Sequence, residues 1–159
     1  MTSIYFLRHG LADRSAWSGD DYERPLTPYG KDRMVKEAKT IGKLNLGLDI
    51  IISSPLTRAI QTAEIVADYL DLFDILVEDE RLEPGFSPGD LSEILDENPE
   101  VEAVMVVGHE SDFSLTIERI IGGGNIVCKK GSLARVDLTD AGVLSGELIW
   151  LLPPKLLVK

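Results

Sequence analysis

Two histidines and two arginines stand where they could act together on a phosphoryl group. Arg8-His9-Gly10 and Gly108-His109-Glu110 each follow a short apolar run, the pattern of a buried strand that ends in a turn. Arg58 follows a third apolar run and lies in the first turn of a predicted helix. A neutral imidazole is a good nucleophile near neutral pH, and one guanidinium group can donate hydrogen bonds to two phosphoryl oxygens. The pattern therefore predicts phosphoryl transfer, whereas Arg8-His9-Gly10 alone would equally fit a surface histidine in a turn.

Arg58 carries an argument of its own. A cation in the first turn of a helix opposes the helix dipole by roughly 0.3–1 kcal/mol. Arg58 also lies off the apolar stripe of its helix, so packing does not explain it. An anion bound at this helix N-terminus would remove the conflict, although a solvated arginine that tolerates a small penalty is the simpler alternative.

Strands and helices alternate along the chain. Strands are predicted at residues 4–7, 50–52, 75–77 and 103–107, with further strands at 126–137 and 146–152. Helices are predicted from 27 to the 42–47 region and at 56–70, 90–95 and 111–121, with polar or Pro/Gly-rich loops at 11–26 and 81–89 and an end to the fold at Pro153-Pro154. This order predicts a three-layer α/β/α fold with a mainly parallel sheet and an antiparallel edge. Both histidines follow parallel strands, so they fall at the same edge of the sheet. Ligands bind at this edge, outside the carboxyl ends of the strands.

Composition narrows the class of protein. The 159 residues are one domain's worth, and we expect a single domain over 1–159. A formal net charge of −11 argues against nucleic acid or an anionic membrane as the partner. The chain contains no apolar run of membrane-spanning length and no signal peptide pattern, and its one cysteine, Cys128, fits a reducing compartment. We expect a cytoplasmic monomer in which Cys128 is buried in a strand.

The quoted motifs resemble those of the histidine phosphatase superfamily, which has the phosphoglycerate mutase-like fold. The resemblance rests on Arg8-His9-Gly10, on residues 54–63 (SPLTRAIQTA) and on Val107-Gly108-His109-Glu110. Within the superfamily, the chain resembles the SixA-type phosphohistidine phosphatases in its short length and in residues 24–30 (RPLTPYG) and 82–85 (LEPG). The resemblance covers nearly the whole chain in the expected order.

The resemblance implies roles for the four residues. His9 would be the nucleophile that forms a phosphohistidine intermediate, and Arg8, Arg58 and His109 would bind the phosphoryl oxygens. It implies no metal or organic cofactor. The implied substrate is a phosphohistidine on another protein, such as a phosphotransfer domain of a signalling relay.

Two positions depart from the family or leave a role open. Proline often stands two residues after the second histidine, where this chain has Ser111, which could cap the following helix beside Asp112. Larger members use a carboxylic acid to protonate the leaving oxygen, and Glu83 is the candidate here, with a solvated loop glutamate as the alternative. The P–N bond of phosphohistidine breaks without much help from an acid, whereas an alkoxide needs a proton.

Other classes of function remain open from the sequence. A small-molecule phosphomonoesterase of the same superfamily would share the motifs. A metal-dependent hydrolase would use His9 and His109 with Glu110 or Asp112, but no two histidines have ligand spacing. A phosphoprotein-binding module without catalysis would need only the arginines, so the presence of His9 argues against it.

Overall fold

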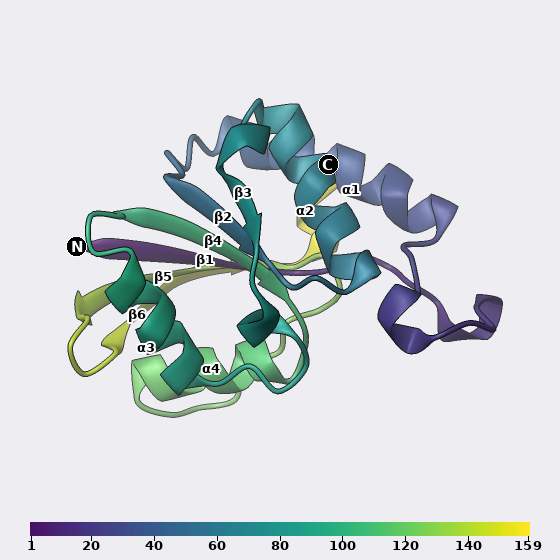
Figure 1. Ribbon diagram of the computed structural model, residues 1–159. Coiled ribbons are helices and arrows are strands. Elements are labelled where there is room, and N and C mark those ends of the chain that lie inside the picture. The colour runs from purple at the N-terminus through teal and green to yellow at the C-terminus, as the bar shows by residue number, and fades with distance from the viewer.

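A six-stranded sheet forms the centre of the computed structural model, which describes residues 1–159 except for the side chain of residue 16 (Figure 1). The strand order is β3-β2-β4-β1-β5-β6, with β1 parallel to β4 and antiparallel to β5. β2 is parallel to both β3 and β4, and β5 is antiparallel to β6. The predicted mainly parallel sheet with an antiparallel edge is therefore confirmed. The strands are β1 Thr2–Arg8, β2 Ile50–Ser53, β3 Leu76–Glu78, β4 Ala103–Gly108, β5 Leu133–Asp140 and β6 Ser145–Leu152.

Helices cover both faces of the sheet, as the three-layer prediction requires (Figure 1). Alternate residues of β1 point to opposite faces: Tyr5 and Leu7 pack with α1 and α2, whereas Ile4 and Phe6 pack with α3 and α4. Each face thus has its own apolar core. The helices are α1 Pro28–Lys43, α2 Thr57–Leu70, α3 Pro88–Glu97, α4 Asp112–Ile121 and α5 Pro154–Leu157.

The helix ends follow local sequence signals. The Thr27 side chain accepts a hydrogen bond from the backbone N–H of Gly30, and Pro28 occupies the first helical position of α1. Ser87 and Asp90 form a reciprocal capping box that starts α3 earlier than the predicted residue 90. Gly122 ends α4 with φ of 91°, a conformation that glycine adopts without strain.

Three predictions about local structure were wrong. The strand expected from 126 begins only at Leu133, and Cys128 lies in the preceding loop, although it is buried. Pro153-Pro154 does not end the fold, because α5 follows and buries Leu157 against the α1 side of the sheet. Residues 11–26 are not a plain loop, since they contain 3₁₀ turns at Arg14–Ala16 and Asp21–Glu23.

Among the described helices, none is both long and apolar enough to cross a membrane.

Candidate active site

Three neighbouring strands end at one edge of the sheet and place the predicted residues around a single pocket. In the register, Arg8 lies opposite Gly108, and Ser53 lies opposite Val107. The pocket has a volume of about 940 Å³. Four of the residues that line it are the predicted phosphate-site residues, Arg8, His9, Arg58 and His109.

The ring of His9 is held in one orientation. The side chain is 5% exposed, and its Nδ1 lies 2.8 Å from the carbonyl oxygen of Gly10. Because a carbonyl only accepts, Nδ1 must carry the proton, and Nε2 of the neutral ring keeps its lone pair. Gly10 is itself held by Thr62, whose hydroxyl accepts a hydrogen bond from the Gly10 N–H at 3.1 Å. The lone pair of Nε2 is thereby left free of any proton that a base would have to remove.

The surroundings of His9 keep it uncharged. Burial is the largest of the effects that together lower the pKa of His9 from 6.5 to about 3; His109, Arg58 and Arg8 act in the same direction, and the Gly10 hydrogen bond opposes them. The imidazole is thus neutral, the form in which it can attack phosphorus.

Arg8 supplies one permanent positive charge to the pocket. Its Nη1 donates to the carbonyl of Cys128 at 2.9 Å, while the buried Nε has no partner in the described structure. Burial lowers the pKa of Arg8, and the negative charge of Glu110 opposes this effect only in part. An unpartnered guanidinium N–H at the end of β1 is a donor for which a bound oxyanion would provide the acceptor.

Arg58 differs from the sequence-based expectation. It is 5% exposed, so the alternative of a solvated arginine was wrong, as was the premise that Arg58 lies outside the packed side of α2. Its Nη1 donates to the backbone carbonyl of Asp21 at 2.9 Å, and its Nη2 lies 3.4 Å from the Asp21 carboxylate. The opposition to the helix dipole is therefore partly offset by Asp21 even without an anion.

His109 faces His9 across the pocket, with the two ring centroids 5.3 Å apart. Its Nε2 lies 2.8 Å from the hydroxyl oxygen of Ser54, and the Leu56 N–H donates to the same oxygen at 3.2 Å. Burial, followed by the charges of Arg58 and Arg8, lowers the pKa of His109 to about 4.

The protein can now be compared with known families. Residues 4–86, more than half of the chain, match the family model of the histidine phosphatase superfamily (branch 1). The chain belongs to this superfamily. The predicted family is therefore confirmed.

Solved structures with this fold include several phosphatases. The protein histidine phosphatase SixA in complex with tungstate is 26% identical to this chain, with a TM-score of 0.88 over 98% of this chain and 99% of that one. A structure from Agrobacterium tumefaciens, assigned as a phosphohistidine phosphatase SixA, is 24% identical, with a TM-score of 0.80 over 96% and 99%. A mycobacterial glucosyl-3-phosphoglycerate phosphatase is 17% identical, with a TM-score of 0.75 over 96% and 100%. The fold is thus shared with phosphatases that are named for different substrates.

A match in sequence is shorter. An uncharacterised protein of Picosynechococcus sp. is 45% identical over 64 residues, a segment that spans 40% of this chain and 39% of that protein.

Sequence reasoning missed two members of this superfamily site. Arg24 was noted only as part of residues 24–30, yet it is buried, lines the pocket and donates from Nη1 to the carbonyl of Ala12. Asp21 accepts a hydrogen bond from Arg24 Nε at 3.0 Å and also contacts Arg58. No periodicity marks either residue, because both depend on how residues 11–26 fold back over the start of α2.

The carboxyl groups near the pocket are placed differently from the expectations. Glu83 does not line the pocket, although its neighbour Pro84 does. Glu110 lines it, but its carboxylate accepts hydrogen bonds from the hydroxyl and the N–H of Ser114 and from the Cys128 N–H. The expected Ser111 cap was wrong, because the Ser111 side chain makes no capping bond and Glu110 takes that place at α4.

The described structure contains no cluster of side chains that could hold a metal ion. No group of three or more His, Cys, Asp and Glu side chains there has a metal-binding arrangement.

Proposed function

We propose that this protein is a phosphohistidine phosphatase that works through a phosphohistidine at His9. The observation that carries the proposal is the hydrogen bond from His9 Nδ1 to Gly10, which leaves the Nε2 lone pair available in a pocket lined by Arg8 and Arg58. The similarity to the SixA protein histidine phosphatase bound to tungstate, an oxyanion of the same shape as phosphate, supports it.

In the first step, His9 Nε2 attacks phosphorus as the P–N bond of the substrate breaks. The electrons of that bond stay on the departing ring nitrogen, and a proton already on the other ring nitrogen lets it leave as neutral imidazole. Arg8, Arg58 and His109 bind the phosphoryl oxygens, so the two permanent charges stabilise the transition state.

In the second step, water attacks the phosphorus of phosphorylated His9. The P–N bond to Nε2 breaks, orthophosphate leaves, and the ring recovers the neutral form with its proton on Nδ1. The neighbouring arginines hold the phosphoryl group in place during both steps through their hydrogen bonds and positive charge. An arginine stays charged at every pH at which the protein works.

The carboxyl groups of the pocket support a P–N rather than an alkyl P–O substrate. A hydrogen bond from Arg24 lowers the pKa of Asp21, and hydrogen bonds from Ser15 lower that of Asp13. Both are anions at neutral pH and poor proton donors, and the Glu110 carboxylate already accepts three hydrogen bonds. Such a site suits a leaving group that needs no general acid.

The physiological substrate in this proposal is a phosphohistidine on another protein, such as a phosphotransfer domain. The enzyme acts as a cytoplasmic monomer built from one domain, and no cofactor takes part in the proposed steps.

A comparison of substrates tests the proposal. We expect the purified protein to hydrolyse a phosphohistidine peptide well, an aryl phosphate weakly and an alkyl phosphate hardly at all. Glu83→Gln should leave hydrolysis of the phosphohistidine peptide unchanged. Efficient alkyl phosphate hydrolysis that falls by roughly 10²–10⁴-fold in Glu83→Gln would instead identify a small-molecule phosphomonoesterase with Glu83 as its acid.

A further inference from the structure

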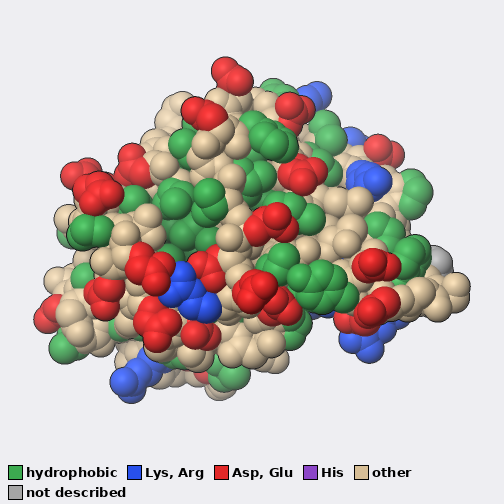
Figure 2. Space-filling model, viewed as in Figure 1, with side chains coloured by type: hydrophobic (Ala, Val, Ile, Leu, Met, Phe, Trp, Pro, Cys, Tyr) green, Lys and Arg blue, Asp and Glu red, His purple; other side chains and the backbone are tan. Residues whose placement is uncertain are grey.

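The active-site pocket has the opposite charge balance to the whole chain. Five basic and three acidic side chains line the pocket, whereas the chain has 16 basic and 27 acidic residues. Figure 2 shows acidic side chains spread over the face that carries α2, β3 and α3. Repulsion over most of the surface and attraction at one place orient an acidic partner toward the pocket.

Two of the basic side chains are exposed and are not required to hold the pocket together. Arg14 has a side chain that is 81% exposed, and its closest acidic group is Asp21 at 3.9 Å. Lys130 is exposed on the loop before β5, and no ion pair holds it within the described part of the chain. Both line the pocket from its outer side, so they are available to a second molecule.

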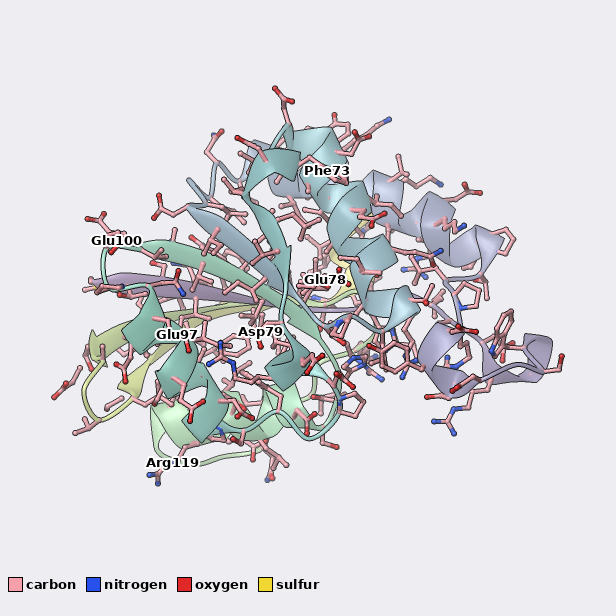
Figure 3. All side chains as sticks on the ribbon, in the orientation of Figure 1. Phe73, Glu78, Asp79, Glu97, Glu100 and Arg119 are labelled. Carbon is pink, nitrogen blue, oxygen red and sulfur yellow. The ribbon has the colours of Figure 1, made fainter. Side chains whose placement is uncertain are left out.

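Other arginine side chains of this protein are already paired with acidic groups and cannot bind a partner in the same way. Arg81 is bound by Asp79 at 2.6 Å and by Glu97 at 2.7 Å, so its charge is neutralised in place. Figure 3 labels Asp79 and Glu97, which belong to the side of the molecule that carries α3. Arg14 and Lys130 have no comparable partner, and their charge acts outward.

Exposed aromatic side chains stand beside these charges. Tyr29 is 62% exposed and lines the pocket. Trp17 lines a smaller depression that shares Arg14, Asp21 and Arg24 with the pocket. The indole N–H of Trp17 donates to the carbonyl of Asp20 at 2.8 Å, which fixes the ring. Arginine and rigid aromatic side chains are the residues most enriched where protein surfaces bind one another.

We propose that Arg14, Trp17, Tyr29 and Lys130 form a docking rim for an acidic segment that flanks the target phosphohistidine. The inference rests on the proposed function and adds the chemistry of the partner: carboxylates beside the phosphohistidine meet Arg14 and Lys130, and the chain next to it packs on the aromatic rings. The phosphoryl group itself enters deeper, between Arg8 and Arg58.

Phosphohistidine peptides of matched length test the rim. Their flanking residues are Asp and Glu in one peptide, Ser and Gly in the second, and Lys in the third. We expect kcat/KM to be about 10-fold higher for the acidic than for the Lys-flanked peptide at low salt, and the ratio to shrink as salt is added. The double variant Arg14→Glu with Lys130→Glu should lose or reverse this preference and keep the wild-type rate on an aryl phosphate.

A charge-matched control separates the rim from net charge. The double variant Lys36→Glu with Arg119→Glu makes the same change at exposed positions that do not line the pocket, and Arg119 lies on α4 on the side of Figure 3 away from residues 13–22. It should keep the preference for the acidic peptide. Equal kcat/KM for the three peptides, or the same loss in both double variants, would overturn the rim. Failure to hydrolyse any of the peptides, with aryl phosphate hydrolysis intact, would overturn the proposed function and the rim with it.

Discussion

At the scale of single residues, the site depends on how polar side chains are held rather than on which types are present. His9 is useful because Gly10 fixes its proton on Nδ1, and Arg8 because its Nε lacks a protein partner. The residue types and their positions after strands were readable from the sequence. The hydrogen bonds were not, because Arg8 binds the carbonyl of Cys128, which is 120 residues away.

The first prediction concerns the charge of His9. Because burial and the neighbouring cations hold its pKa at about 3, its ring should stay neutral from pH 8 down to pH 5. NMR of the labelled imidazole measures this directly, and bound vanadate should raise the pKa by adding negative charge. A titration near 6.5 in the free protein would contradict the described electrostatics.

The second prediction concerns Glu37, which is 1% exposed with an unpartnered Oε2. Burial raises its pKa from 4.5 to about 8, so the folded protein keeps a proton that the unfolded chain releases above about 4.5. Stability should therefore fall as pH rises from 4.5 to 8, by up to about 1.4 kcal/mol per pH unit. Glu37→Gln should remove this slope in urea unfolding measured across that range; an unchanged slope would assign it to other groups.

At the scale of elements, the loop before β5 holds the backbone of His9, the proposed nucleophile, in place. The Gly131 N–H donates to the carbonyls of Arg8 at 3.1 Å and His9 at 3.0 Å. Gly131 has φ of +82°, and a Cβ there would lie 2.6 Å from Glu37 Oε1. The loop, α1 and the end of β1 thus meet at a point where only glycine fits. The sequence predicted a strand in this loop, because residues 126–128 form an apolar run that does not show that the backbone turns.

The third prediction follows from this contact. Gly131→Ala should destabilise the fold by about 1–3 kcal/mol and lower kcat, because the loop must move away from Glu37 and from the backbone of His9. Gly47→Ala is the control, since φ is +63° there and nothing lies within 4 Å. It should show the backbone cost alone, with unchanged activity. Equal effects of the two substitutions on kcat would show that the loop does not position His9.

At the scale of the whole molecule, the order of strands and helices was predictable and the walls of the pocket were not. Alternating apolar runs and amphipathic stripes indicated the layers, since each element needs one face buried. The folding of residues 11–26 depends instead on buried Arg24 and on Asp21 meeting Arg58, contacts between distant positions that have no periodic signature. The same segment carries the exposed Arg14 and Trp17, which belong to the proposed docking rim.

The central claim is that the phosphoryl group passes through His9, and the most direct test is to trap it there. The protein is mixed with a ³²P-labelled phosphohistidine peptide, quenched in alkali, and the labelled residue is located by mass spectrometry at neutral to alkaline pH. We expect a label that is stable in alkali, lost in acid and located on His9, and no label in His9→Ala, with the fold of that variant confirmed by circular dichroism. Label on another residue, or turnover retained by a folded His9→Ala variant, would contradict the account.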